Sequence, residues 1–278
     1  MCTFCTPSLD RRTILRHAII GGSVLAASPL WVASLAHSAT GVVGSARIPD
    51  VNTRALSPPA IVSRRQWGAN EMIRANQRQF APVRKLIVHH TASPNNPRNP
   101  LEVVRFIQTY YTLDRKYGDT GYNFIIDHKG VIYEGRASRR YSPGEPITGE
   151  DSSGWGVVGA HAKNNNAGSC GICLIGDFDT ASPTDAALAS LTTVLAWKAN
   201  RHRIDATRSD TYVDIHGKRR TYPNISGHRQ IGETLCPGKR LFALLPTIRT
   251  EVVHRAGHWA PITVDVPAVI RQESGALR

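Results

Sequence analysis

Lys85-Leu-Ile-Val-His-His90 is the stretch of the sequence that decides the fold. Its aliphatic and β-branched run is typical of a buried strand. The run ends in His89 and His90, and side chains at the end of a strand can project from the rim of a sheet. The stretch therefore predicts a buried strand and, at its end, a candidate functional site.

Other strands and helices alternate along the chain on both sides of this stretch. Strands are expected over residues 122–126, 131–134 and 171–176. Helices are expected to begin at residue 100 and to span residues 185–201 and 239–253. Residues 205–224 are polar and irregular, which indicates a loop or a small hairpin. Interleaved strands and helices predict a single α/β domain over residues 59–255.

The first two helices begin with clear sequence signals. Asn99-Pro100-x-Glu102 has the N-cap residue, the first-turn proline and the acid of a capping box. The helix that follows places four residues on one face: Val103, Ile107, Tyr110 and Tyr111. Ser182-Pro183-Thr184-Asp185 begins the second helix, whose inward residues are Leu188, Leu191 and Leu195.

The composition excludes several classes of protein. The chain has 278 residues, of which 41% are hydrophobic and 20% charged, so it is neither disordered nor collagen-like. Five cysteines are too few for a disulfide scaffold. The one long apolar stretch lies at the N-terminus, which excludes a polytopic membrane protein.

The N-terminal segment is predicted to be an export signal. A basic region with Arg11 and Arg12 precedes an apolar run over residues 18–36 that ends in small residues. The arginine pair followed by Ile-Leu is similar to the twin-arginine signals of bacteria. A membrane anchor and a general secretory signal are the alternatives. We therefore divide the chain into a signal peptide (1–36), a linker (37–58), the domain (59–255) and a C-terminal tail (256–278).

The charge of the chain indicates which classes of partner it binds. It has 34 Lys and Arg against 21 Asp and Glu, a formal charge of +13. Without residues 1–36 the count is 31 against 20, so the mature protein keeps +11. For an exported protein, a basic surface favours anionic cell-wall polymers and lipid headgroups. We expect a periplasmic, cell-wall or extracellular location, no nucleic-acid partner and no membrane span in the mature protein.

Two segments carry residue types that bind metals. His228-x7-Cys236 lies in a loop-like stretch, with Cys236 just before the last helix. A thiolate at a helix N-terminus is stabilised by the helix dipole, which suits metal binding. With the histidines that end the 85–90 strand, two His and one Cys would give Zn²⁺ three protein ligands and leave the fourth position for water. Spacing alone does not bring the two segments together.

Cys170 and Cys173 form a Cys-x-x-Cys sequence at a predicted strand. A disulfide or a shared metal ion is one interpretation. Positions three apart in a strand face opposite sides of the sheet, which favours two separately buried small residues.

Seven segments, in order, resemble the family of peptidoglycan recognition proteins and type 2 N-acetylmuramoyl-L-alanine amidases. They are Ile61-Val-Ser-Arg-Arg-Gln-Trp-Gly-Ala69, Leu86-Ile-Val-His-His-Thr-Ala92, Asp119-Thr-Gly-Tyr-Asn-Phe124, Gly130-Val-Ile-Tyr-Glu-Gly-Arg136, Gly159-Ala-His161, Gly171-Ile-Cys-Leu-Ile-Gly176, and Gly227-His-Arg229 with Thr234-Leu-Cys-Pro-Gly238. The resemblance spans about residues 60–250. It implies a mixed central β-sheet flanked by helices, with a groove that holds glycan and stem peptide.

The resemblance assigns roles by position. It implies that His89, His228 and Cys236 bind Zn²⁺. Tyr122 falls on the tyrosine next to the metal, and Thr234 falls where other members place a residue that stabilises the transition state. Members that only bind peptidoglycan lack one of the ligands, so the complete set implies an enzyme.

Three further residues are expected to contact the substrate: His90, His161 and Arg136. His90 follows a metal ligand on the opposite side of an extended chain, so a packed residue is the alternative. His161 belongs to one of the matching segments, and a surface histidine is the alternative. Arg136 ends the matching segment that begins at Gly130.

The resemblance therefore implies an exported zinc amidase that acts on peptidoglycan or muropeptides. Zinc-activated water would cleave the amide between N-acetylmuramic acid and L-Ala, with Tyr122 and Thr234 stabilising the transition state. A non-hydrolytic peptidoglycan-binding module and a zinc peptidase that cuts the stem peptide are the alternatives.

Overall fold

The structure, a computed structural model, describes residues 55–75, 77–260 and 270–273. The predicted signal peptide and residues 37–54 of the predicted linker lie outside the described residues. Within those ranges, no helix combines the length and the apolar character needed to cross a lipid bilayer.

The central sheet has five strands in the order β4-β3-β6-β2-β9. β2 (Lys85–His90) pairs in parallel with β6 (Ser169–Leu174) and with β9 (Ile225–Gly227). β3 (Phe124–Ile126) pairs in parallel with β6, and β4 (Ile132–Glu134) joins β3 as an antiparallel hairpin. The sheet is therefore mixed, as the resemblance implies, and the four predicted strands form within two residues of their expected ends.

The register of the parallel strands brings distant residues side by side. Val88 of β2 pairs with Gly227 of β9. His89 and His228, which follow those two residues, therefore lie next to one another at the carboxyl edge of the sheet. The carboxyl ends of parallel strands are the usual place for a binding site in an α/β fold.

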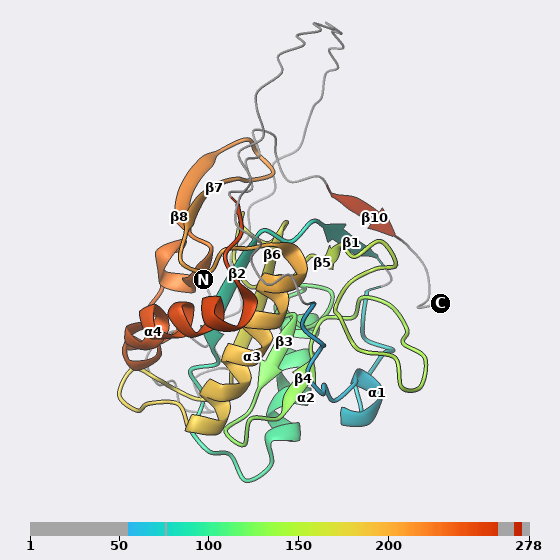
Figure 1. The fold of residues 1–278 in the computed structure, drawn as a ribbon. Helices are drawn as coiled ribbons and strands as arrows, with labels where there is room; N and C mark the ends of the chain where they lie inside the picture. The colour runs from blue at the N-terminus through green and yellow to red at the C-terminus, as the bar shows by residue number, and fades with distance from the viewer. Residues whose placement is uncertain (1–54, 76, 261–269, 274–278) are drawn as a thin grey trace, which may run out of the picture. The chain divides into compact units, whose positions relative to one another are not determined.

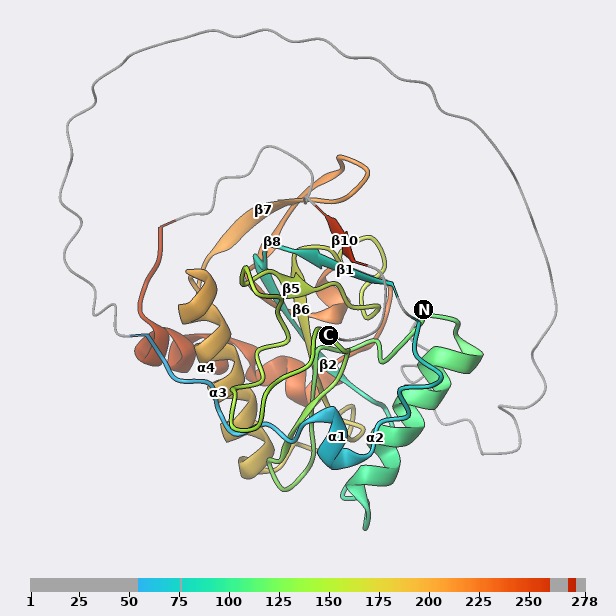
Figure 2. The same ribbon diagram turned by 90° about the vertical axis from the view of Figure 1, so that its right-hand side faces the viewer.

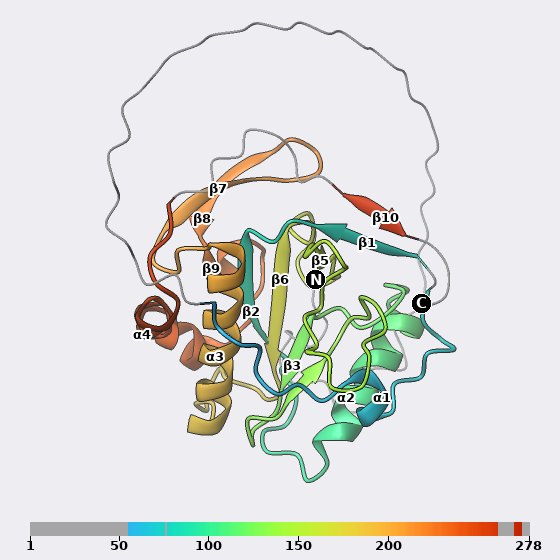
Figure 3. The same cartoon turned by 45° about the vertical axis from the view of Figure 1, so that its right-hand side comes forward.

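Helices cover both faces of the central sheet, as Figures 1 and 3 show. α3 (Asp185–His202) and α4 (Lys239–Ala256) lie on one face, in a hydrophobic core that includes Val88. α2 (Pro100–Thr109) lies on the other face, in a second core that includes Ile125. The flanking helices confirm the predicted α/β architecture.

The helix ends match the sequence signals in part. Thr184 is the N-cap of α3, and its hydroxyl accepts a hydrogen bond from a backbone nitrogen of the first turn. α4 runs three residues beyond its expected end. Asn99 is the N-cap of α2, but the predicted capping box is wrong. The Asn99 amide donates to the Glu102 carboxylate at 2.9 Å instead of accepting a bond from the backbone.

α2 continues into a π-helix over Tyr110–Asp114. The backbone nitrogen of Arg115 donates to the carbonyl of Tyr110, five residues earlier, which is the hydrogen bond of a π turn. The wider turn changes the direction of the side chains that follow α2. The apolar pattern of the sequence predicts a regular helical face here and contains no sign of this change.

Strands outside the central sheet form two smaller sheets. β1 (Arg78–Ala81) pairs in antiparallel fashion with β5 (Gly156–Val157) and with β10 (Arg271–Glu273). β10 lies in the C-terminal tail, where the sequence predicts no element. The predicted loop or small hairpin after α3 is a hairpin of β7 (Ser209–Val213) and β8 (Arg219–Pro223).

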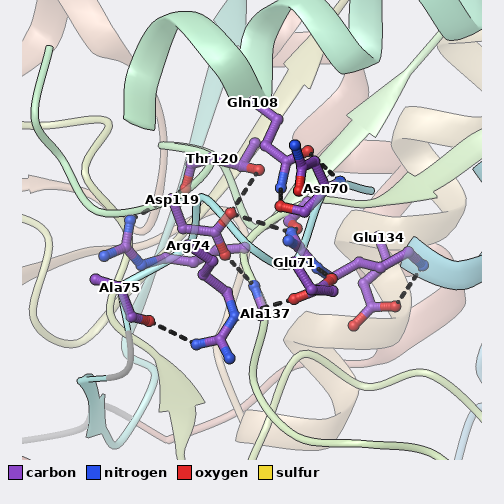
Figure 4. Close-up of polar contacts among 12 residues, drawn as sticks. Asn70, Glu71, Arg74, Ala75, Gln108, Asp119, Thr120, Glu134 and Ala137 are labelled. Atoms are coloured by element: carbon purple, nitrogen blue, oxygen red, sulfur yellow. Dashed lines mark hydrogen bonds and ion pairs between the residues drawn. The ribbon is translucent and has the colours of Figure 1, made fainter. Parts of the chain in front are cut away.

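α1 (Arg64–Trp67), which lies beside α2 in Figure 2, helps to hold the segment that leads to Tyr122. The buried guanidinium of Arg64 lies 3.2 Å from the carboxylate of Asp119. Asp119 in turn accepts a hydrogen bond from the backbone nitrogen of Ala137 at 2.9 Å (Figure 4). The segment before Tyr122 is therefore tied to two other parts of the chain.

A buried carboxylate joins α3 to the segment before β5. Glu150 is fully buried, and its oxygens lie 2.5 to 3.0 Å from Lys198, Arg201 and His202. Burial alone would raise the pKa of Glu150, but the hydrogen bond from His202 and the charge of Lys198 hold this pKa at about 2. The carboxylate is thus ionised inside the protein, and its three partners compensate its buried charge.

Cys170 and Cys173 pack on opposite faces of β6. Cys170 belongs to the core under α3 and α4, and Cys173 belongs to the core under α2. The prediction of two separately buried small residues is confirmed, and the geometry does not allow both sulfurs to bind one ion.

Candidate metal centre

The three predicted metal ligands converge at the carboxyl edge of the central sheet. One ligand atom each from His89, His228 and Cys236 lies within 4.8 Å of the others. The two imidazole centroids are 4.7 Å apart, and Sγ of Cys236 lies 3.6 Å from Nδ1 of His89. Across residues 55–75, 77–260 and 270–273, this is the group of three or more His, Cys, Asp or Glu side chains that has the geometry to hold a metal ion.

Each ligand comes from a different element. His89 lies in β2, and His228 directly follows β9, the parallel neighbour of β2. Cys236 lies in the turn before α4. Its sulfur accepts a hydrogen bond from the backbone nitrogen of His90 at 3.4 Å, and its carbonyl accepts one from Arg229 at 2.8 Å. These backbone contacts hold the thiol against the two imidazoles.

The ligand atoms suit a metal ion in chemistry as well as in position. Nδ1 of His228 is buried and has no hydrogen-bond partner among the described residues. A buried polar atom without a partner costs about 1 to 3 kcal/mol, which a metal ion bound there would offset. Two imidazoles and one thiolate form a ligand set found in zinc sites that keep a coordination position open.

Burial keeps the histidines of this site neutral. Burial, and next the charge of His228, hold the pKa of His89 well below its usual value. Burial also lowers the pKa of His228 to about 4 and that of His161 to about 3. The neutral imidazole is the form that binds metal, so no proton has to leave these side chains at pH 7.

His161 lies at the site, beside a ligand. Its Nδ1 is 3.1 Å from Nε2 of His89, which leaves Nδ1 of His89 facing Cys236. β6 makes room for the ring, because a Cβ at Gly171 would lie 2.5 Å from Cδ2 of His161. Histidine ligands commonly use their second ring nitrogen in such a hydrogen bond, which fixes the tautomer and the ring orientation.

The two residues predicted to stabilise the transition state adjoin the ligands. Tyr122 is buried, and its ring centroid lies 5.2 Å from that of His89. Thr234 is half-buried, and its hydroxyl accepts a hydrogen bond from the backbone nitrogen of Cys236 at 3.2 Å. The structure therefore brings Tyr122 to the histidines and Thr234 to the cysteine.

Arg136 lies on the segment that leads to Tyr122. Its half-buried guanidinium donates to the carbonyls of Thr120 and Tyr117 at 3.1 and 3.2 Å. The backbone nitrogen of Arg136 donates to the carbonyl of Tyr122 at 2.8 Å. Arg136 is thus a neighbour of the site through Tyr122.

His90, predicted to contact the substrate, does not lie at the site. Consecutive residues of a strand point to opposite faces, and the side chain of His90 is fully buried on the face away from His89. Its Nδ1 accepts a hydrogen bond from the backbone nitrogen of Phe178 at 3.2 Å. The His90 ring thus packs against Phe178 on the face away from the metal ligands, so the alternative interpretation of a packed residue fits His90.

The sequence did not predict one hydrogen bond at the site. The hydroxyl of Tyr111 donates to that of Tyr122 at 2.9 Å. The apolar pattern assigns Tyr111 to the helix core, where the structure does bury it, but gives no reason for its hydroxyl to meet another phenol. The contact depends on the π-helix, and no periodic pattern of the sequence predicts that irregular turn.

Comparison with known proteins identifies the family. The model of the family Amidase_2, described as N-acetylmuramoyl-L-alanine amidase, matches residues 79–239. A human N-acetylmuramoyl-L-alanine amidase is 32% identical over 196 residues, which are 69% of this chain and 29% of the human protein. Peptidoglycan recognition protein 1 of Bos taurus is 30% identical over 191 residues, 67% of this chain and 82% of that protein. The chain thus spans most of the bovine relative and less than a third of the human one.

Solved structures of related proteins share the fold. Drosophila PGRP-LB is 28% identical with a TM-score of 0.50, over 73% of this chain and 98% of that one. Peptidoglycan recognition protein-LE, in complex with tracheal cytotoxin, is 26% identical with a TM-score of 0.51, over 73% of this chain and 97% of that one. The chain belongs to the N-acetylmuramoyl-L-alanine amidase family, Amidase_2, together with the peptidoglycan recognition proteins.

Proposed function

We propose that this chain is a zinc-dependent amidase that hydrolyses the bond between N-acetylmuramic acid and L-Ala in peptidoglycan. The observation that carries the proposal is the convergence of His89, His228 and Cys236 at one edge of the sheet. Recognition of peptidoglycan alone does not require three buried metal-binding side chains beside a tyrosine. Relatives named as amidases support the same reaction.

Zinc would be held by one nitrogen of each histidine and by the sulfur of Cys236. When bound, zinc lowers the pKa of a coordinated water to roughly 7 and polarises a carbonyl oxygen. His89 and His228 are neutral because of their burial, so each offers a lone pair at neutral pH. His161 holds Nε2 of His89 and keeps Nδ1 of that ring directed at Cys236.

Tyr122 would stabilise the charge that develops during the reaction. As water adds to the lactyl carbonyl, the carbonyl oxygen gains negative charge, and the hydroxyl of Tyr122 would donate a hydrogen bond to it. The Tyr122 ring packs 5.2 Å from that of His89, so its hydroxyl belongs to the same site. Thr234 would act from the segment that carries Cys236, where its hydroxyl already contacts the backbone.

We further propose that the substrate is peptidoglycan or a muropeptide outside the cytoplasm. The structure of peptidoglycan recognition protein-LE in complex with tracheal cytotoxin, described as monomeric diaminopimelic acid-type peptidoglycan, supports this class of ligand. Arg136, half-buried beside the Tyr122 segment, would offer its guanidinium to carboxylates of the stem peptide. The predicted export signal and the charge of +11 that remains without residues 1–36 suit a protein that acts on the cell wall.

Digestion of muropeptides by the purified protein tests the proposal. The fragments are identified by mass, with and without a chelator. A free lactyl carboxylate together with released stem peptide supports the amidase, and a shortened stem peptide supports a zinc peptidase instead. Binding without cleavage supports a recognition module, the rival function that the names of several relatives suggest. His89→Ala is the matched control, because it should bind muropeptide without cleaving it.

A further inference from the structure

Two buried phenols form a hydrogen bond next to the proposed metal centre. The hydroxyl of Tyr111 donates to the hydroxyl of Tyr122 at 2.9 Å. Tyr111 is 4% exposed and Tyr122 is 1% exposed, so the bond is shielded from water. The two rings meet edge to face, with centroids 5.5 Å apart. The Tyr122 hydroxyl, which we propose stabilises the transition state, thus has a defined hydrogen-bond partner.

Two features of the backbone allow this contact. Tyr111 is the second residue of the π-helix Tyr110–Asp114, and π turns within helices are rare and frequent at functional sites. Gly121, directly before Tyr122, lets the Tyr111 ring approach, because a Cβ there would lie 2.9 Å from its Cε1. A wide helical turn and a glycine therefore serve the same pair of tyrosines.

We propose that Tyr111 is a positioning residue for the amidase reaction and acts through Tyr122. Its hydroxyl donates to the Tyr122 oxygen and orients the Tyr122 O–H toward the reacting carbonyl of the substrate. This inference rests on the proposed function. A phenol that accepts one hydrogen bond still has its own proton to donate. It also becomes a stronger donor, because hydrogen bonds in a chain polarise one another.

The contribution of Tyr111 is greatest in the transition state. The substrate carbonyl is neutral on binding and gains negative charge only as water adds to it. A better-oriented and more polarised Tyr122 hydroxyl therefore lowers the barrier more than it strengthens substrate binding. Tyr111 should affect kcat and leave KM unchanged.

Tyr111→Phe tests the proposal, because it removes the hydroxyl and keeps the ring. We expect kcat for muropeptide cleavage to fall about 3- to 10-fold, the size of one hydrogen bond, with KM and bound zinc unchanged. In a Tyr122→Phe background, Tyr111→Phe should cause no further fall. Tyr110→Phe is the matched control, since it removes the neighbouring hydroxyl of the same π-helix and should keep the wild-type kcat.

Three results would overturn the positioning role. A wild-type kcat in Tyr111→Phe overturns it and leaves the proposed function intact. An equal fall in the wild-type and Tyr122→Phe backgrounds also overturns it, because the hydroxyl then acts independently of Tyr122. Loss of zinc from Tyr111→Phe assigns the hydroxyl to the metal centre instead. Failure of the wild-type protein to release stem peptide is a different result, which removes the proposed function and the positioning role together.

Discussion

His161 and His89 form a buried pair of imidazoles, with Nδ1 of His161 3.1 Å from Nε2 of His89. The pair determines which nitrogen of His89 meets the thiol of Cys236, because Nδ1 is left facing Sγ at 3.6 Å. Both rings are neutral through burial, and a His89 that binds metal through Nδ1 would carry its proton on Nε2 and donate it to Nδ1 of His161. His161 is therefore part of the candidate metal centre although it is not one of the proposed ligands.

Truncation of His161 should weaken metal binding while the protein stays folded. His161→Ala removes the hydrogen bond that fixes the His89 ring, and we expect zinc affinity to fall about 10- to 100-fold. The dissociation constant is measured by competition with a chromophoric chelator. His216→Ala, at the exposed tip of the β7–β8 hairpin, is the control and should bind zinc as the wild type does. An unchanged zinc affinity in His161→Ala would contradict the role of this pair.

Gly171→Ala should reproduce that loss with the imidazole still present. A Cβ at this position would lie 2.5 Å from the His161 ring, so the ring must move away from His89. Zinc affinity should fall in Gly171→Ala, and the same substitution should have little further effect in a His161→Ala background. An independent loss of equal size in both backgrounds would show that Gly171 acts on the centre by another route.

Substitution of the ligands should remove zinc and activity together. His89→Ala and Cys236→Ser each leave two of the three donors, and we expect both variants to lose bound zinc on dialysis and to lose cleavage of muropeptides. Metal content is measured by atomic emission. Cys170→Ala is the matched control, since this thiol is buried under α3 and α4 on the other face of the sheet. A metal-free Cys236→Ser protein with full activity would refute the zinc mechanism.

Tyr122→Phe should slow turnover far more than it weakens binding. The variant loses the hydroxyl that would donate to the developing oxyanion, and removal of one such donor costs about 10² to 10³ in rate. Dye release from labelled cell walls measures turnover, and binding to the same walls measures affinity. Unchanged dye release would mean that Tyr122 has no part in the transition state.

Local sequence signals predicted the local parts of the fold. The run Lys85–His90 forms a strand because its apolar residues suit burial on both faces, and Thr184 caps α3 because its hydroxyl satisfies a free backbone nitrogen. The histidines at the end of β2 and the cysteine before α4 indicated a metal site, because their side chains are of types that bind metals. Such signals depend on a few neighbouring residues, which the sequence shows directly.

Contacts between distant segments could not be predicted in this way. His89 and Cys236 are 147 residues apart and meet only because β9, three residues long, pairs beside β2. β10 is equally short and forms by pairing with a strand almost two hundred residues earlier along the chain. The hydroxyl contact of Tyr111 depends on a single irregular turn. Spacing reveals none of these, because each depends on where the rest of the chain folds.

Glu150 should make the stability of the protein depend on pH. Its pKa falls from 4.5 to about 2 on folding, so it adds stability above pH 4.5 that is lost as pH falls toward 2. At pH 7, Glu150→Gln leaves Lys198 buried without its charge partner and should cost about 3 to 5 kcal/mol. Urea unfolding of the metal-free proteins should show the stability difference between the wild type and Glu150→Gln narrowing as the pH falls from about 5 to about 2.

Glu251→Gln is the control for that measurement. Glu251 and Arg255 form an exposed pair on α4, so its loss should change stability little at any pH. A gap between the wild type and Glu150→Gln that stays constant from pH 7 to pH 2 would show that Glu150 is not ionised in the folded protein.

Titration of the metal-free protein with zinc shows whether the reaction depends on the metal, with release of stem peptide from a muropeptide followed by mass. A zinc amidase should show no cleavage without metal and a rate that rises in proportion to added zinc until each chain holds one ion. Cleavage at full rate by the metal-free protein would contradict the proposed function, as would a fully zinc-loaded protein that releases no stem peptide.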